Sequence, residues 1–210
     1  DFQELNAGAV DNWQNGGTAS EWGLRSLFGR IDYDFAGKYL FEANLRRDGS
    51  SRFAEGNQYG TFPSFSIGWR ISEENFLKDV EWLSSLKLRA SWGQLGNQQI
   101  GTYPFASTIR LGTNYIFGNV PANGAAQTDM ANSKISWEET TTQGIGLDLG
   151  ILGNKLNITY DYYVRNTSGI LLQLPIPGII GLNKPYQNAG KVNNTGWDLS
   201  INYSNRDKAF

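Results

Sequence analysis

The sequence has 210 residues, a formal net charge of −2, and neither cysteine nor histidine. The length suits one good-sized domain, and the near-neutral charge predicts no nucleic-acid partner. The missing residue types exclude disulfides, thiolate or His-ligated metal sites, and any catalytic triad that needs a histidine base. No apolar run approaches the roughly 18 residues of a membrane helix, but this criterion does not detect transmembrane β-strands.

Alternation of apolar and polar residues marks the strands that we expect along the chain. Each segment has the period of two that is typical of a half-buried β-strand. In chain order, the segments are 27–35, 39–46, 62–71, 86–93, 144–149, 156–165 and 196–203. We therefore expect an all-β chain of antiparallel strands with almost no long helix.

The connections between these segments alternate in length. Residues 36–38 and 153–154 predict tight turns, whereas 96–135 and 166–194 are long and rich in Gly, Asn, Pro and aromatic residues. One end of the sheet should therefore carry trim turns and the other end large loops. The prolines of the stretch LPIPG (174–178) exclude a central strand and predict an extended loop.

Two connections carry more specific signals. Residues 72–85 begin with Ser-Glu-Glu and continue with apolar residues on one side, which predicts helical character. The pair Asp48-Gly49 suits a turn. The arginines beside this pair are expected to bind Asp48, Glu55 or lipopolysaccharide phosphates, as a structural brace rather than a substrate contact.

Two pairs of adjacent carboxylates raise the question of acid-base catalysis. Neighbouring residues of a strand point to opposite faces, so Glu138 and Glu139 cannot act together on one substrate. Glu73 and Glu74 open the expected helix, where acidic residues favour the helix dipole. We therefore expect no catalytic residue.

Two interpretations of the alternating faces compete. In a soluble β-sandwich the apolar face packs inward and the polar face meets water. In an outer-membrane barrel the apolar face contacts lipid and the polar face lines the lumen. Strand lengths near ten residues, aromatic residues at the ends of the apolar faces and alternating long loops favour the barrel, without excluding the sandwich.

Long, ordered phrases carry a resemblance to a known family. They include RRDGSSRF (46–53), YGTFPS (59–64), GWR (68–70), LKLRAS (86–91) and NAGKVNNTGWDLSINY (188–203). With them, nearly the whole chain resembles the barrel of SusC/RagA-type TonB-linked outer-membrane proteins of Bacteroidetes. The resemblance implies an antiparallel up-and-down transmembrane β-barrel of roughly 22 strands. This chain would supply about seven or eight of them.

The resemblance also implies an organisation and a function. Residues 1–210 would be part of one barrel domain, with the N-terminal plug domain not present. Because the sequence starts without a signal peptide and stops after a turn-like ending, we expect a piece of a longer protein. The whole protein would import oligosaccharides or oligopeptides across the bacterial outer membrane and would not be an enzyme. Its partners would be a SusD-like surface lipoprotein, the TonB complex reached through the plug, and outer-membrane lipid.

Two alternatives stay open at this point. One is a secreted, soluble β-sandwich that binds carbohydrate through loop aromatics, and this protein would fold in plain buffer. The other is a TonB-dependent siderophore receptor, which shares the barrel but has no lid protein. No metal or cofactor is expected in this chain.

The barrel interpretation assigns the two faces of the strands to different surroundings. Polar residues expected to line the lumen are Arg30, Asp32, Glu42, Asn44, Arg46, Arg70, Arg89, Asp161 and Arg165. Apolar residues expected to contact lipid are Tyr39, Phe41, Leu45, Ile67, Trp69, Leu88, Trp92, Ile158, Tyr160, Leu199 and Ile201. The glycines at 144 and 146 are expected to be small lumen-facing residues.

Aromatic residues in the loops are the ligand-binding candidates. Aromatic faces stack on sugar rings, and an apolar body with a polar tip suits a wet binding site. The candidates are Trp13, Trp22, Tyr103, Tyr115 and Phe117. The alternative is a packing role, in which these rings hold the loops against each other or against the lid protein.

Overall fold

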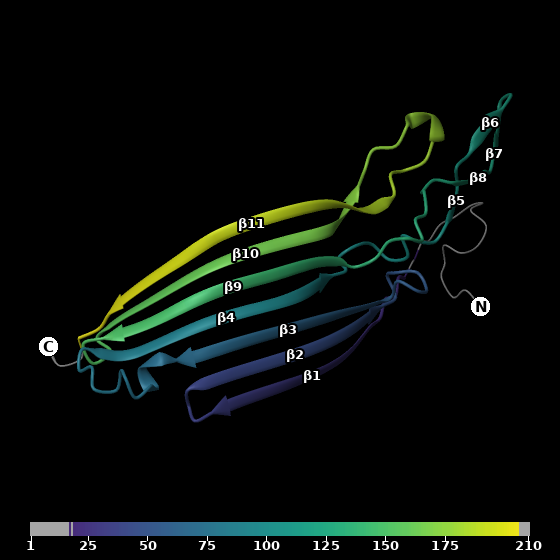
Figure 1. Ribbon diagram of the computed structural model, residues 1–210. Helices are drawn as coiled ribbons and strands as arrows, with labels where there is room; N and C mark the ends of the chain where they lie inside the picture. Colours follow the sequence, from purple (N-terminus) through teal and green to yellow (C-terminus); the bar gives the residue numbers. More distant parts are fainter. Residues whose placement is uncertain (1–16, 18, 206–210) are drawn as a thin grey trace.

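A computed structural model describes residue 17 and residues 19–205 (Figure 1). Seven long strands form one antiparallel sheet, in the order β1-β2-β3-β4-β9-β10-β11. Their bounds are β1 (Leu24–Phe35), β2 (Tyr39–Ser50), β3 (Tyr59–Arg70), β4 (Leu83–Asn97), β9 (Glu138–Ile151), β10 (Leu156–Gln173) and β11 (Tyr186–Tyr203). Each long strand pairs with the next along the chain, so the predicted all-β, up-and-down topology is confirmed.

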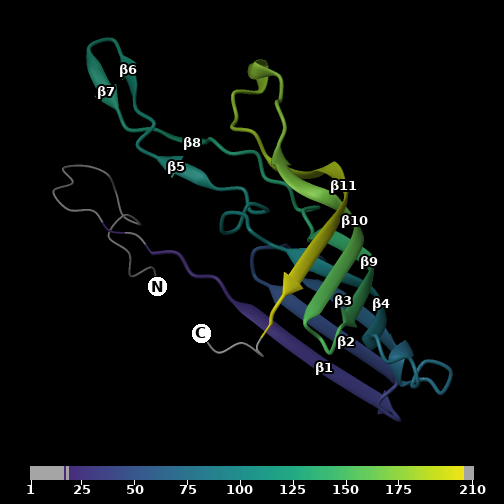
Figure 2. The ribbon, with the colours of Figure 1, turned by 90° about the vertical axis from the view of Figure 1, so that its left-hand side faces the viewer.

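The sheet is a single curved layer (Figure 2). β1 and β11 are its two edges and do not pair with each other, so the described strands do not close a barrel. Apolar side chains in mid-strand are exposed: Ile31 by 66%, Phe65 by 47% and Ile201 by 60%. A β-sandwich would cover one face with a second sheet, and the described residues contain no such layer.

The two ends of the sheet differ as predicted. One end has tight turns, in which Ala36 and Gly37 (φ 55° and 68°), and later residues 152–154, take left-handed backbone conformations. The other end carries the loops 51–58, 98–137 and 174–185. The second of these loops contains four short strands, β5 (Ile109–Leu111), β6 (Tyr115–Phe117), β7 (Val120–Ala122) and β8 (Ala125–Gln127), in an arm that projects beyond the sheet (Figure 1). The LPIPG stretch lies outside β10 and β11, as expected.

The prediction of helical character over 72–85 is wrong. The chain forms a 3₁₀ turn, η2 (Ile71–Glu73), and continues as turns in which Leu77 N donates to Glu74 O (3.0 Å) and Val80 N to Leu77 O (3.1 Å). The side chain of Glu74 does not cap a helix but accepts hydrogen bonds from two strands, as described below. None of the helical segments among the described residues is long and apolar enough to cross a membrane.

The turn expected at Asp48-Gly49 is also wrong, because β2 continues to Ser50. Gly49 pairs with Tyr59 of β3. The Tyr59 ring occupies the space beside it: a Cβ at Gly49 would lie 2.8 Å from Cδ1 of that ring. The glycine permits this close approach, and the chain reverses later, over residues 51–58.

A small hydrophobic core lies at the loop end. It consists of Phe53, Phe62, Ile100, Ile135 and Trp137, with Leu171 and Tyr186 packed against it. The Trp137 ring lies 5.2 Å from that of Phe53 and 5.4 Å from that of Phe62, and its Nε1 donates to Gln58 O (3.0 Å). This core joins residues of the loops 51–58 and 98–137 to the ends of β3, β10 and β11.

Candidate functional site

The pairing register brings the nine polar residues predicted to line the lumen to one face of the sheet. Paired residues of neighbouring strands point to the same face, and pairing runs from Arg30 through Asn44 to Ser64. The same face continues from Arg89 of β4 through Gly146 of β9 to Asp161 of β10. Alternation brings the remaining members to this polar face: Asp32, Glu42, Arg46, Arg70 and Arg165.

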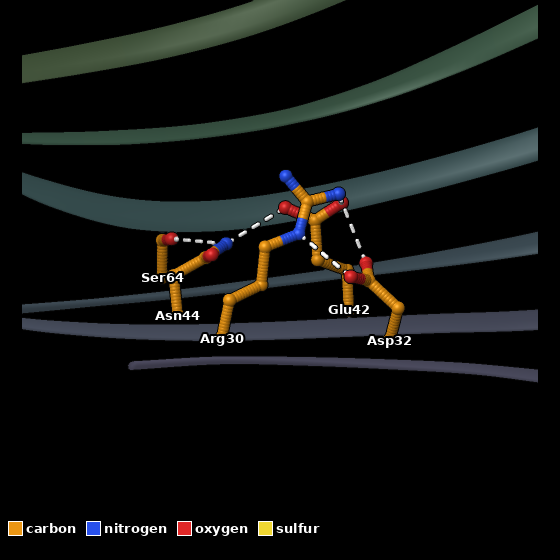
Figure 3. A network of polar contacts seen from close by, with 5 residues as sticks. All are labelled: Arg30, Asp32, Glu42, Asn44 and Ser64. Carbon is orange, nitrogen blue, oxygen red and sulfur yellow. Dashed lines mark hydrogen bonds and ion pairs between the residues drawn. The ribbon is translucent and has the colours of Figure 1, made fainter. Parts of the chain in front are cut away.

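The Arg30 network joins β1, β2 and β3 (Figure 3). The Arg30 guanidinium binds both oxygens of Asp32 (2.8 and 2.9 Å) and Glu42 Oε2 (3.1 Å). Asn44 Nδ2 donates to Glu42 Oε1 (2.7 Å) and to Ser64 Oγ (3.4 Å). The side chains project from β1 and β2 toward the side over which the later strands arch, so the polar face is the inner face of the curved sheet.

The Arg89 bracket spans three strands further along. Arg89 of β4 binds both oxygens of Asp148 on β9 (2.8 and 3.2 Å) and Asp161 on β10 (3.0 Å). It passes over Gly146 of β9, where an added Cβ would lie 2.7 Å from Arg89 Nη2. The absence of a side chain at Gly146 therefore lets the guanidinium reach the third strand.

A hollow of about 550 Å³ lies between the Arg30 network and the Arg89 bracket. Small residues form much of its floor, including Ser66, Gly68, Ser91, Gly144 and Gly146. Each of the two clusters holds one guanidinium and two carboxylates. The hollow therefore presents a polar, slightly acidic wall in which both arginines are already paired with carboxylates, which suits passage of a polar solute better than its tight retention.

Two other arginines of this face, Arg46 and Arg70, serve as local braces. Arg46 binds Asp48 (2.7 Å), one of the partners predicted for it, and Arg70 Nη1 donates to Gly37 O (3.2 Å) in the turn between β1 and β2. Arg52 Nη1 donates to Gln98 O (3.3 Å). These three arginines therefore fix strand ends and loops.

The eleven residues predicted to contact lipid lie on the opposite, apolar face. One row of paired residues runs across six strands. In strand order it consists of Tyr39, Trp69, Leu88, Leu147, Tyr160 and Leu199. Alternation brings Phe41, Leu45, Ile67, Trp92, Ile158 and Ile201 to the same face. Neighbouring rings stack across strands, for example Tyr39 on Trp69 at 6.4 Å. An exposed apolar surface of this extent indicates a non-aqueous neighbour.

Glu74 closes the turn end of this aromatic row. It accepts hydrogen bonds from Tyr39 Oη (2.6 Å), Lys38 Nζ (3.0 Å) and Trp69 Nε1 (3.2 Å). These donors, Tyr39 first, lower the pKa of the Glu74 carboxyl from 4.5 to about 2. No local pattern predicts this role of Glu74, because it depends on two strands and a turn meeting in space.

The loop aromatics do not form one platform. Trp22 lies under the Arg52 guanidinium (4.5 Å from ring centroid to Cζ), and Tyr103 packs edge-on against Phe105 (6.0 Å). Tyr115 and Phe117 pack together in the β6–β7 hairpin (5.0 Å) and are both about two-thirds exposed. Trp13 lies outside the described residues.

No group of three or more acidic side chains is placed to hold a metal ion within residues 17 and 19–205. Glu138, one member of a carboxylate pair, accepts hydrogen bonds from Leu171 N (3.2 Å) and Asn97 Nδ2 (3.4 Å). Its contacts are therefore structural.

Comparison with known proteins finds a family model and relatives that agree on one family. The family model for the TonB dependent receptor-like β-barrel matches residues 1–209. TonB-dependent receptor P39 of Formosa agariphila is 42% identical over 186 residues, which cover 89% of this chain and 18% of that protein. TonB-dependent receptor SusC of Bacteroides thetaiotaomicron is 41% identical over 186 residues, covering 85% of this chain and 18% of SusC.

Solved structures give the same result. The RagAB peptide transporter is 34% identical with a TM-score of 0.79, over 87% of this chain and 20% of that chain. The RagAB peptide importer in its closed-closed state is 31% identical with a TM-score of 0.80, over 98% of this chain and 23% of that chain. The chain spans about a fifth of the length of the curated relatives that it matches.

Proposed function

Because the chain belongs to the TonB-dependent receptor-like β-barrel family, we propose that it is a section of the wall of an outer-membrane importer of large nutrients. The single observation that carries this proposal is the curved sheet, which has paired charges on its inner face and an exposed apolar outer face. The relatives are named receptors and not enzymes, and the proposed role is transport without covalent chemistry.

In this proposal the polar face lines the lumen and the apolar face contacts lipid. The row from Tyr39 to Leu199 would lie in the membrane, since its rings and aliphatic side chains meet no other protein layer among the described residues. The wall would be completed by further strands pairing with the edges β1 and β11, to give a barrel of roughly 22 strands.

The loop end would face the outside of the cell, because outer-membrane barrels carry their long loops there. Two loop tips offer apolar surface for a SusD-like lipoprotein lid. One is the β6–β7 hairpin with Ile116 (64% exposed), and the other is the β10–β11 loop with Ile179 (97% exposed); both project beyond the sheet (Figure 1). Energy would come from the TonB complex, acting through a plug domain outside this sequence.

The cargo would be an oligopeptide or an oligosaccharide. RagAB is named a peptide importer, and the polar inner wall suits either class.

Whole-cell uptake tests the importer directly. A strain that lacks the receptor containing this chain is compared with the wild type for uptake of a casein digest and of a mixture of malto-oligosaccharides, with and without a protonophore. We expect loss of uptake of one class, and the same loss in wild-type cells treated with protonophore. Equal uptake of both classes by both strains would contradict the importer.

A further inference from the structure

A pocket of about 500 Å³ lies at the loop end, away from the hollow of the inner wall. Three parts of the chain line it: residues 19–21 before β1, residues 101–104, 106 and 108 after β4, and residues 184–186 before β11. Asp129, Met130 and Gln173 complete the lining. We call it the loop-junction pocket. Of the ligand-binding candidates that the structure describes, only Tyr103 lines it.

Hydrogen bonds between the loops hold the pocket open in one shape. Asn132 Nδ2 donates to Tyr186 O (2.8 Å), and Asn132 N donates to Pro104 O (3.3 Å). Asn183 N donates to Thr128 O (2.7 Å), and Asn183 Nδ2 donates to Asp129 Oδ1 (2.9 Å). These bonds fix the lining segments after β4 and before β11 to one another, so a ligand would not have to order those two segments on binding.

Tyr103 has an unusual backbone in this wall. Its φ is 53°, in the left-handed region that a residue with a side chain seldom adopts. Ala106 N donates to Tyr103 O (3.0 Å), which closes the turn, and the ring is 44% exposed. A tyrosine held in a conformation that favours glycine indicates that the ring itself is used.

The pocket presents unpaired charges of both signs. Glu21 and Lys184 are exposed, and neither makes a hydrogen bond or ion pair with another residue in the described part of the chain. Asp129 differs, because Asn183 and Thr128 (3.0 Å) occupy both its oxygens. Pro104 and Met130 add apolar surface beside the Tyr103 ring.

We infer that the loop-junction pocket binds a short peptide with free termini. Lys184 receives the carboxylate, Glu21 receives the amino group, and an apolar side chain lies against Tyr103 and Met130. A neutral glycan would use neither charge. The inference rests on the proposed function and deepens it, since it selects peptide over oligosaccharide as the cargo recognised at the loops.

Calorimetry on the intact detergent-purified receptor tests this inference. The probes are the tetrapeptide Ala-Phe-Leu-Ala, its amidated and acetylated forms, and maltotetraose. We expect the free tetrapeptide to bind, and each terminal block to weaken binding about tenfold, as for loss of a charge-assisted contact of about 1.4 kcal/mol. In Lys184→Met, amidation of the peptide should no longer weaken binding, whereas acetylation still should. In Glu21→Gln, acetylation should no longer weaken binding, whereas amidation still should.

Matched controls separate binding from folding. Lys78→Met and Glu81→Gln alter the same residue types in the connection at the opposite end of the sheet and should change no affinity. Tyr103→Gly should weaken binding of the free peptide without lowering stability, because glycine accepts a φ of 53° without strain.

Three results would overturn the inference. Equal affinity of all variants for the tetrapeptide would show that the pocket does not bind it. Importer function would not be contradicted by this result, because the uptake experiment measures it separately. Binding of maltotetraose by the wild type, together with loss of that binding in Tyr103→Gly, would show that the ligand of the pocket is a glycan and not a peptide. Absence of binding by every probe in a receptor that is active in uptake would exclude the pocket as a cargo site.

Discussion

The seven-stranded wall and the loop end place their apolar residues in opposite ways. In the wall, Ile31, Ile67 and Ile201 are 66%, 57% and 60% exposed, whereas Phe53 and Ile135 at the loop end are fully buried. The wall therefore depends on an outside medium to cover its apolar face, and the loop end carries a core of its own. A loop region with its own core can hold a binding surface in fixed geometry in water.

The largest expected effect comes from removing that core. Trp137→Ala deletes the contacts with Phe53 and Phe62 and the hydrogen bond to Gln58. We expect a loss of about 3–5 kcal/mol in the local stability of the loops, measured by hydrogen exchange of residues 98–137 in the intact receptor. Exchange of β2 and β10 in mid-strand should change little.

Trp82→Ala is the matched control, because Trp82 is 61% exposed at the opposite end. Equal increases in loop exchange for both variants would show that the loop core does not fix the loops.

A smaller effect is expected in the wall at Gly146. Gly146→Ala adds a Cβ that would overlap the Arg89 guanidinium and the Asp161 carboxylate. These are the ends of flexible side chains, so they move, and the bridge between them is lost at a cost of about 1 kcal/mol or less for partly exposed charges. Thermal unfolding in detergent measures the loss.

Two comparisons isolate this effect. Gly29→Ala should be neutral, since an added Cβ there meets nothing within 4 Å. In an Asp161→Asn background, Gly146→Ala should cost less than in the wild type. Additive effects of the two substitutions would mean that Gly146 does not serve the bridge.

The smallest effect appears only in acid. The pKa of Glu74 is lowered from 4.5 to about 2 by its three donors. A carboxylate with a depressed pKa stabilises the folded state fully above pH 4.5, and this contribution is lost as the pH falls toward 2. The unfolding temperature of the wild type should therefore drop across this window.

Glu74→Gln should flatten that drop, whereas Glu73→Gln, at an exposed neighbour, should leave it unchanged. An identical pH profile for Glu74→Gln and the wild type would show that the carboxylate is not held by Tyr39, Lys38 and Trp69.

These sites show which features the sequence could predict. Alternation is a property of each strand alone, so the strands and the common face of Arg30 and Asn44 followed from local pattern. The Arg89 bracket and the Glu74 contacts depend on the register between strands that are distant in sequence, which no local pattern encodes. The signals at 72–85 and Asp48-Gly49 failed because tertiary contacts, Tyr39 on Glu74 and Tyr59 on Gly49, overrode local preference.

The most direct test of the two-faced wall uses the absence of native cysteine. Ser66→Cys and Ile67→Cys are neighbours in β3 on the polar and apolar faces. In the intact receptor in outer-membrane vesicles, a small charged thiol reagent should label Ser66→Cys and leave Ile67→Cys unlabelled until the membrane is dissolved and the protein unfolded. Equal labelling of both positions in the membrane would contradict the account.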